Sequence, residues 1–278
     1  WIMGLGILTA ILLCFTKITN HSLGKELLMR LIFIIIAFGT TAIIAALAYK
    51  EYATFSRNNR EIVRLINPTN YLSGTYRYLQ KMQLANREFT IIDPDARHAP
   101  YPDEDITVLI VVLGETTRAA NFGLNGYERN TTPKLSQKEV IAFQKVSSCG
   151  TATAVSVPCM FSNMNRKNFD VNDAKFSENI FDLAQKTNYS LWWRDNDDGC
   201  KGVCTRIPHE IITQKDYPEH CDGMSCYDEA LLVGLEETLA SLTQDTIIVL
   251  HTIGSHGPTY FKRYPDQFKQ FTPTCDTA

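Results

Sequence analysis

A short run of small residues between two cysteines, SSCGTATAVSVPCMF from Ser147 to Phe161, contains two hydroxyl groups that could do chemistry, those of Thr151 and Thr153. A threonine hydroxyl hardly ionises at neutral pH, so a nucleophilic threonine needs a general base or a metal ion that stabilises the alkoxide. Zinc lowers the pKa of bound water from about 15.7 to about 7, and we expect a similar effect on a bound hydroxyl. Glu115 could supply one oxygen ligand for such an ion.

The alternative role for these threonines is structural, because threonine often caps helices. A helix that begins near Thr153 tolerates Pro158 close to its first turn, and its free amide groups would face an anion. A disulfide between Cys149 and Cys159 would hold that turn in place. The residues of this segment leave both interpretations open, helix capping by Thr151 and Thr153 or catalysis.

Further polar side chains follow three apolar segments that are typical of strands. The segments and the polar residues that belong to them are Ile106–Gly114 with Glu115, Tyr189–Trp193 with Arg194 to Asp197, and Thr246–Gly254 with His251 and His256. Each polar group taken alone could be a solvated loop charge. Ligand sites in parallel sheets form at the carboxyl ends of the strands, so the groups taken together favour a metal or phosphate site.

The same segments indicate the fold class. Helical stretches precede the second and third strands, ENIFDLAQKT at 178–187 and DEALLVGLEETLASL at 228–242. The first strand is a continuous apolar run, typical of a strand buried in a parallel sheet. Strands that alternate with helices predict an α/β fold with a doubly wound parallel sheet.

The eight cysteines indicate an oxidising compartment, because disulfides persist only there. Six of them fall into close pairs that we expect to be disulfides: Cys149 with Cys159, Cys200 with Cys204, and Cys221 with Cys226. The alternative, a zinc site, fits less well because the spacing departs from the usual paired C-x2-C pattern. Cys275 is left over, and we expect its partner beyond Ala278.

The N-terminal part of the chain is apolar enough to enter a membrane. Residues 31–49 carry no charge and would rise about 28 Å as a helix, close to the thickness of a bilayer core. We interpret residues 1–15 as the end of a second, truncated span and the basic loop 16–30 as cytoplasmic. Residues 50–103 are expected to contain two bridging helices, at 51–66 and 70–85 and broken at Pro68, followed by a linker rich in Pro and Asp. The helices would either lie at the membrane interface or pack on the globular domain. A formal net charge of -3 does not favour nucleic-acid binding.

Four long motifs resemble those of the lipid A phosphoethanolamine transferases: VVLGETTRAANFGLNGYERNTTPKL, SSCGTATAVSVPCMF, WWRDNDDGCKGVC and VLHTIGSHGPTYFKRYP. These enzymes belong to the alkaline phosphatase and sulfatase superfamily and are related to the mobile colistin-resistance transferases. The resemblance runs from Trp1 to Ala278. It implies an inner-membrane, multi-pass protein whose residues 104–278 form the first part of a periplasmic catalytic domain with a partial alkaline-phosphatase-like sheet.

The resemblance also implies roles for single residues. Thr153 would be the nucleophile and, with Glu115, a ligand of Zn2+. Lys201 and His256 would hold the phosphate group. Asp197 and Asp198 lie where related enzymes line the ethanolamine pocket, whereas His251 has no role in the motif and is expected to be structural. The Asp-His pair that completes the zinc site of the family is absent, so the remaining ligands are expected beyond residue 278, and this chain by itself is expected to be inactive.

The implied reaction transfers phosphoethanolamine from phosphatidylethanolamine, the donor, to lipid A, the acceptor, and confers resistance to polymyxin and other cationic peptides. The nearest alternative is a phosphodiesterase or sulfatase of the same superfamily that passes the group to water. Sulfatases use a modified Cys or Ser, and Thr153 argues against them. A second alternative is a non-catalytic periplasmic module.

Overall fold

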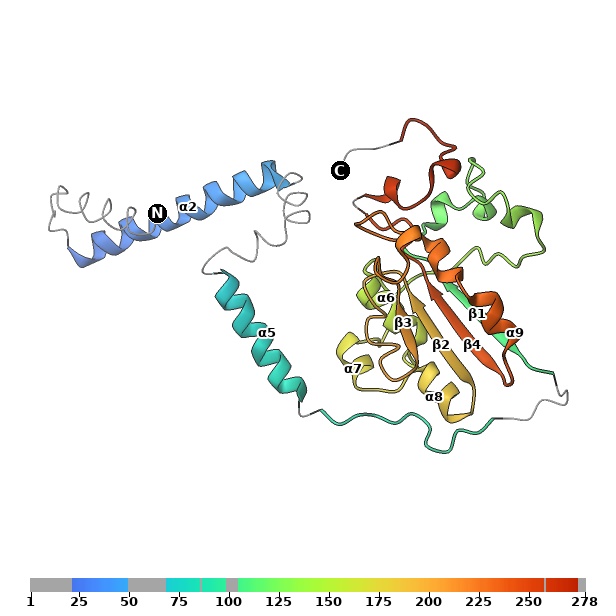
Figure 1. The fold of residues 1–278 in the computed structure, drawn as a ribbon. Helices are drawn as coiled ribbons and strands as arrows, with labels where there is room; N and C mark the ends of the chain where they lie inside the picture. Colours follow the sequence, from blue (N-terminus) through green and yellow to red (C-terminus); the bar gives the residue numbers. More distant parts are fainter. Residues whose placement is uncertain (1–21, 50–68, 86, 99–104, 258, 275–278) are drawn as a thin grey trace. The chain divides into compact units, whose positions relative to one another are not determined.

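The computed structural model describes the chain except for residues 1–21, 50–68, 86, 99–104, 258 and 275–278 (Figure 1). The expected first span at 1–15, the first bridging helix at 51–66 and Cys275 lie outside the described residues. The chain divides into two units, Trp1–Tyr76 and Arg77–Ala278.

The first unit contains the long apolar helix α2, Leu23–Leu47. Its segment Gly24–Leu47 has a mean hydropathy of 2.4, and 24 residues rise about 36 Å, so the helix has the length and composition of a membrane span. The helix starts eight residues before the predicted span at 31, since residues 23–30 of the predicted loop are helical. Glu26 and Arg30 form an ion pair one turn apart (3.0 Å) in this part of the helix.

Helix α5, Thr69–Ala85, begins directly after Pro68, where the sequence predicted a break. The segment that follows α5 docks onto the globular part of the second unit. Thr90 forms a parallel bridge with Ser177, and the amide of Ile92 donates to the carboxylate of Glu178 (3.0 Å). The segment between α5 and the predicted linker is therefore fixed to the globular part of the chain.

A four-stranded parallel sheet forms the centre of the second unit, with the order β1-β4-β2-β3. Its strands are β1 Val108–Leu113, β2 Ser190–Asp195, β3 His209–Ile211 and β4 Thr246–His251. The three predicted strands are confirmed, while β3 is an addition. Within the register, Leu113 and Asp195 both lie beside His251, so the carboxyl ends of β1, β4 and β2 are level.

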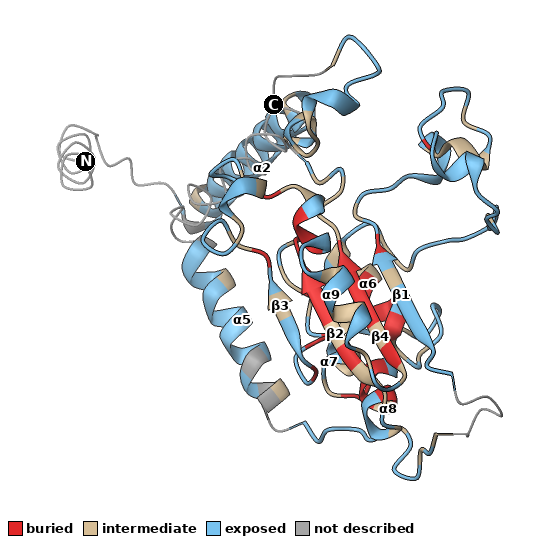
Figure 2. Cartoon of the chain, turned by 45° about the vertical axis from the view of Figure 1, so that its right-hand side comes forward, coloured by how far each residue is buried: buried red, intermediate tan, exposed pale blue. Residues whose placement is uncertain are grey.

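Helices cover both faces of this sheet, as a doubly wound fold requires. On one face, α6 (Thr153–Phe161) and α8 (Ile180–Lys186) pack on a core that includes Phe161, Phe181 and Trp193. On the other face, α9 (Leu235–Ala240) and the 3-10 turn Asp228–Leu232 pack on Ile248 and Leu250. Figure 2 shows that the buried residues concentrate in β2 and β4. Helix α7, Val171–Lys175, lies between α6 and α8 in the chain.

Two expectations about these elements are wrong. The apolar run of β1 predicted a buried strand, but β1 is at the edge of the described sheet, with Leu109 53% and Val112 65% exposed. The predicted helix 228–242 is divided into the 3-10 turn and α9, because Gly234 between them adopts a left-handed φ of 73°. The stretch 178–187 does form one helix, α8, and a capping box between Asn179 and Asp182 closes its start.

All three predicted disulfides are present, Cys149–Cys159, Cys200–Cys204 and Cys221–Cys226. The zinc alternative for these six cysteines is therefore wrong. Cys149–Cys159 ties the loop before α6 to the last turn of that helix, as the sequence suggested. The other two bonds close loops that follow β2 and β3.

Candidate functional site

The candidate site is built at the level carboxyl ends of β1, β4 and β2. His251 is the last residue of the central strand β4. Glu115 follows the end of β1 by two residues, and Asp197 follows the end of β2 by two residues. Because neighbouring strands lie about 4.8 Å apart, residues at equal distances beyond level strand ends meet in one small space.

Glu115 and Thr153 are in direct contact. The Thr153 hydroxyl donates to Glu115 Oε2 at 2.8 Å, and the Thr116 hydroxyl donates to Glu115 Oε1 at 2.7 Å. Two oxygens bound to one tetrahedral zinc ion, each about 2.0 Å from it, would lie about 3.3 Å apart. The separation of the Thr153 and Glu115 oxygens is close to that value, so the two side chains lie near enough to share one ion.

The capping alternative for the threonines is wrong. The N-cap of α6 is Ala152, and no side chain caps the helix. Thr153 is instead the first helical residue, and its hydroxyl is engaged by Glu115. Pro158 lies in the second turn rather than close to the first, buried against the core. The nucleophile candidate therefore stands at the amino end of α6, the end of a helix that favours a bound anion.

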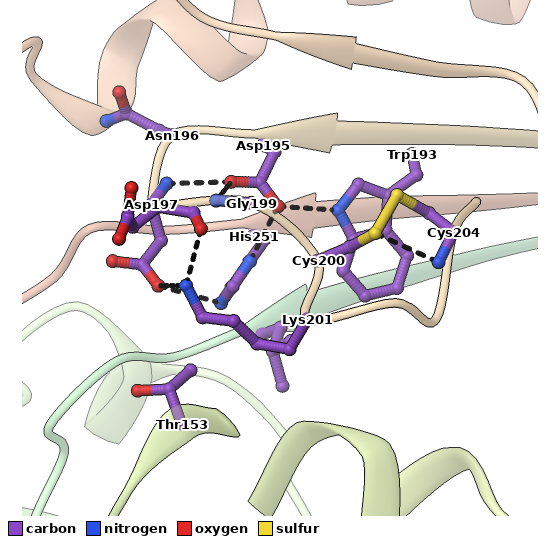
Figure 3. Close-up of polar contacts among 12 residues, drawn as sticks. Thr153, Trp193, Asp195, Asn196, Asp197, Gly199, Cys200, Lys201, Cys204 and His251 are labelled. Carbon is purple, nitrogen blue, oxygen red and sulfur yellow. Dashed lines mark hydrogen bonds and ion pairs between the residues drawn. A yellow bond between two sulfur atoms is a disulfide. The ribbon is translucent and has the colours of Figure 1, made fainter. Parts of the chain in front are cut away.

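A buried hydrogen-bond network holds His251 in place (Figure 3). The Asp195 carboxylate accepts from His251 Nδ1 at 2.8 Å and from Trp193 Nε1 at 2.9 Å. The His251 side chain is fully buried, and that of Asp195 is 2% exposed. An Nδ1 hydrogen that donates to Asp195 leaves Nε2 with its lone pair free, which is how carboxylates orient metal-binding histidines.

His251 Nε2 and Asp197 Oδ2 are both buried atoms; within the described part of the chain His251 Nε2 has no hydrogen-bond partner, and Asp197 Oδ2 is in an ion pair with Lys201 Nζ at 3.2 Å. They lie 4.0 Å apart, and together with a carboxylate oxygen of Glu115 they form a group whose donor atoms are all within 4.8 Å of one another. Buried polar atoms normally have partners, and two oxygens with one imidazole nitrogen are suitable zinc ligands. The side chains present therefore fit a metal ion.

The motif reading treated His251 as structural and Asp197 as a pocket residue, so it missed this group. The argument from strand ends had placed Glu115, Asp197 and His251 at one edge of the sheet and favoured a metal or phosphate site there. The partner that orients His251, Asp195, belongs to a different strand, 56 residues earlier in the chain.

Lys201 lies over the Asp197 side of the site. Its Nζ is 3.2 Å from Asp197 Oδ2 and donates to the backbone carbonyl of Asp198 at 2.6 Å. The Lys201 side chain is 16% exposed, while that of Asp197 is 4% exposed. Asp198 is exposed and contributes to the site through its carbonyl oxygen. The structure thus brings together Glu115, Thr153, Asp197 and Lys201 from the residues selected by sequence.

His256 is not joined to this group by any contact recorded for the described residues. Its Nδ1 lies 2.8 Å from the carbonyl oxygen of Gly257, and its own carbonyl accepts from Arg263 Nε at 3.2 Å. Arg194, in the polar stretch after the second strand, turns to the opposite face of the sheet. It is 1% exposed and donates to the carbonyls of Leu231 and Val233, both at 2.7 Å.

Backbone strain marks two residues next to the site. Thr116 (φ 55°) follows Glu115, and Lys201 (φ 53°) contacts Asp197, and both occupy the left-handed region that non-glycine residues rarely adopt. Strained conformations of this kind cluster at functional sites, where the surrounding structure must compensate for them. The strain therefore supports the location of the site.

Two protein-family models match the chain, one over its apolar N-terminal part and one over its globular part. Residues 107–278 match the sulfatase model, and residues 1–82 match the model of the phosphoethanolamine transferases EptA and EptB. The chain is 45% identical over 277 residues to phosphoethanolamine transferase EptA of Escherichia coli K12, which covers 98% of the chain and 50% of that protein. It is 36% identical over 289 residues to phosphatidylethanolamine transferase Mcr-1 of Escherichia coli, with 99% and 53% covered.

Solved structures of phosphoethanolamine transferases also resemble the chain. Integral membrane lipooligosaccharide phosphoethanolamine transferase A of Neisseria meningitidis aligns with a TM-score of 0.71 and 39% identity, over 100% of this chain and 52% of that one. Its soluble domain aligns with a TM-score of 0.65 and 44% identity, over 69% and 58%. The chain spans about half the length of the curated relatives it matches.

Proposed function

Since the chain belongs to the sulfatase family and its N-terminal part matches the EptA/EptB transferases, we propose that its protein transfers phosphoethanolamine from phosphatidylethanolamine to lipid A. The observation that carries this proposal is the 2.8 Å contact between the Thr153 hydroxyl and Glu115 at the amino end of α6. A hydroxyl in that position can attack phosphorus while the helix amides face the phosphate oxygens.

The metal of this site is proposed to be zinc, with Glu115 and Thr153 as ligands. Asp197 Oδ2 and His251 Nε2 are additional donor atoms in the same small space. When bound, the ion would lower the pKa of the Thr153 hydroxyl and offset negative charge on the phosphate. Three side chains of this site act on the substrate and its protons: Lys201, Thr153 and Glu115.

In the first step, the Thr153 oxygen forms a bond to the phosphorus of phosphatidylethanolamine. The bond from phosphorus to the glycerol oxygen breaks, and diacylglycerol leaves with that oxygen and with the proton that Thr153 gives up through Glu115. Glu115 accepts the hydrogen bond of the Thr153 hydroxyl, so the departing proton has an acceptor in place. Lys201, with His256 from the next loop, stabilises the charge on the equatorial oxygens. Thr153 is left carrying phosphoethanolamine.

In the second step, an oxygen of lipid A attacks the same phosphorus. The bond to Thr153 breaks, and the threonine oxygen takes up the proton that the attacking lipid A group gives up. The added ethanolamine is cationic, so it reduces the negative charge that attracts polymyxin. The exchange of two substrates through one covalent intermediate predicts ping-pong kinetics.

The protein is proposed to be a multi-pass inner-membrane protein whose catalytic domain is periplasmic. Helix α2 supports insertion into a membrane. The three disulfides of the second unit support an oxidising compartment for the domain that carries Thr153.

The test compares Thr153→Ala with a matched control, Thr151→Ala, in the full-length protein. Thr151 is an exposed threonine two residues earlier in the same motif. Lipid A is analysed by mass spectrometry, and the protein is analysed for a phosphoethanolamine adduct. We expect Thr153→Ala to abolish both products, a loss of at least about a thousandfold, and Thr151→Ala to retain them. Modified lipid A in cells that carry only Thr153→Ala would refute the assignment.

The same samples separate transfer from hydrolysis. A hydrolase would release free phosphoethanolamine and leave lipid A unmodified, whether or not the acceptor is present. A non-catalytic module would yield neither product, and its Thr153→Ala variant would be indistinguishable from the wild type.

A further inference from the structure

Asp228 makes contacts that its own 3-10 turn does not require. It is the first residue of the turn Asp228–Leu232, yet no side chain caps that turn. Its Oδ1 accepts from the amide of Ile253 and from Asn196 Nδ2, both at 2.8 Å. Its Oδ2 accepts from the amide of Gly254 at 3.0 Å. One carboxylate thus binds two loops that are far apart in the sequence.

The first of these loops leaves the end of β2 and carries Asp197 and Lys201. Asn196, which directly precedes Asp197, is buried with 6% of its surface exposed. Its amide nitrogen donates to the carbonyl of His251 at 2.9 Å, and its side chain also donates to the carbonyl of Cys226 at 3.0 Å. Asp228 therefore fixes the residue from which Asp197 enters the site.

The second loop leaves the end of β4 and leads to His256. It also touches Glu115. A Cβ atom at Gly254 would lie 2.6 Å from the carbonyl oxygen of Glu115 and 3.2 Å from its nitrogen, so only glycine permits this approach. The amide of Ser255 donates to the same Glu115 carbonyl at 3.3 Å. Because Asp228 binds the amide of Gly254, and Gly254 packs against the backbone of Glu115, Asp228 also helps to fix that backbone.

We propose that Asp228 is a positioning residue that locks the three active-site loops, those of Glu115, Asp197 and His256, in one arrangement. The carboxylate does not contact the Thr153 and Glu115 pair. It acts through Asn196 and Gly254, which are the neighbours of the groups that do the chemistry. This proposal rests on the function proposed above for its kinetic part, whereas its structural part is independent of that function.

The informative substitution is Asp228→Asn, because it preserves the shape of the side chain. A carboxamide has one acceptor oxygen, so its NH2 group must face either the Gly254 amide or the pair formed by Ile253 and Asn196. In either orientation the loop after β4 loses one of its two bonds to this side chain, and in the second orientation the loop after β2 loses its bond as well. Misplacement of reacting groups by about 1 Å costs about a hundredfold in rate. We therefore expect kcat to fall by about 10- to 100-fold while KM changes by less than about twofold.

The matched control is Asp222→Asn. The Asp222 carboxylate likewise accepts from two backbone amides, Met224 at 2.9 Å and Ser225 at 2.8 Å. Those amides belong to its own turn, inside the loop closed by Cys221–Cys226. Both amides bind Oδ1, an acceptor that asparagine retains, so the control makes the same change from carboxylate to carboxamide without placing an NH2 group against an active-site loop.

The experiment measures amide hydrogen exchange and steady-state kinetics of the full-length protein in detergent, with a fluorescent phosphatidylethanolamine donor and lipid A. In Asp228→Asn we expect exchange to accelerate by about tenfold or more in peptides that cover 113–118, 194–201 and 252–257. In Asp222→Asn we expect exchange outside 221–226 and kcat to stay unchanged. Acceleration restricted to 252–257, or a kcat within twofold of the wild type, would overturn the proposal.

The exchange data keep the two hypotheses apart. If the wild-type protein transfers no phosphoethanolamine, the proposed function fails, and the three-loop exchange pattern still decides whether Asp228 is the lock. If the wild type is active and Asp228→Asn leaves all three loops protected, the lock is wrong and the proposed function stands.

Discussion

Replacement of Asp195 by Asn tests the buried network beneath the candidate site. The Asp195 carboxylate accepts four hydrogen bonds. Oδ2 accepts from Trp193 Nε1 and His251 Nδ1, and Oδ1 accepts from the amides of Asp197 and Gly199, both at 3.1 Å. An asparagine carboxamide presents one oxygen and one NH2 group, so two of the four donors would face another donor.

The expected cost follows from that count. Each buried donor left without an acceptor costs about 1–3 kcal/mol. Two such donors would cost about 2–6 kcal/mol together. The His251 ring can relieve one conflict by moving its hydrogen to Nε2 and accepting from the new NH2 group, so we expect a cost in the lower part of this combined range. We expect a loss of about 3 kcal/mol in the free energy of unfolding. For a unit of this size, 1 kcal/mol corresponds to about 2–4 °C, so the midpoint should fall by about 6–12 °C.

The assay is thermal unfolding of the full-length protein, followed by near-UV circular dichroism. The chain has three tryptophans, and two of them, Trp192 and Trp193, lie on β2 beside the substituted residue. Asp198→Asn is the matched control, because Asp198 is exposed three residues away, and it should change stability by less than about 0.5 kcal/mol. A loss below about 1 kcal/mol in Asp195→Asn would refute the reasoning, since it would mean that the four bonds do not depend on a carboxylate.

Two further predictions concern the elements around the site. The disulfide between Cys149 and Cys159, 10 residues apart, restricts the unfolded chain. Replacement of both cysteines by Ser should therefore lower the free energy of unfolding by about 3 kcal/mol in denaturant titrations and should also reduce transfer. Equal stability of variant and wild type would contradict this. Burial acts to raise the pKa of Glu178, but its contacts with Lys186 and the Ile92 amide outweigh that effect and lower the pKa below the ordinary value of 4.5. The stabilising contribution of the Glu178 carboxylate is therefore complete above pH 4.5 and is lost as the pH falls through the folded pKa. The difference in unfolding free energy between wild type and Glu178→Gln should shrink in acid. A difference that persists at low pH would show that it does not come from the Glu178 charge.

The sequence was sufficient to predict the parts of the site that lie in continuous motifs. Thr153 and Glu115 each stand next to a recognisable element, α6 and β1, and the structure brings them into contact. The three disulfides close short loops, so local spacing identified them correctly. In each case the information is carried by residues that are close in the chain.

The sequence did not predict the parts that depend on strand order. The pairing of His251 with Asp195 requires β4 to lie beside β2, and the edge position of β1 follows from the same order. Apolar runs indicate strands but do not specify which strands are neighbours. The three-residue strand β3 is too short for a periodic signal, and its parallel pairing with β2 depends on a contact 16 residues away in sequence, such as that of Trp193 with His209.

The register of the sheet explains why three separate motifs form one site. Leu113 and Asp195 flank His251 at the same level, and Glu115 and Asp197 each lie two residues beyond them. With β4 in the centre, the carboxylates approach His251 from both sides, and no motif contains more than one of the three donors. A one-residue deletion between Leu113 and Glu115 would leave every motif recognisable but would move the Glu115 carboxylate away from Thr153. Activity in this protein is therefore expected to depend on the register between strands as strongly as on the identity of the reactive residues.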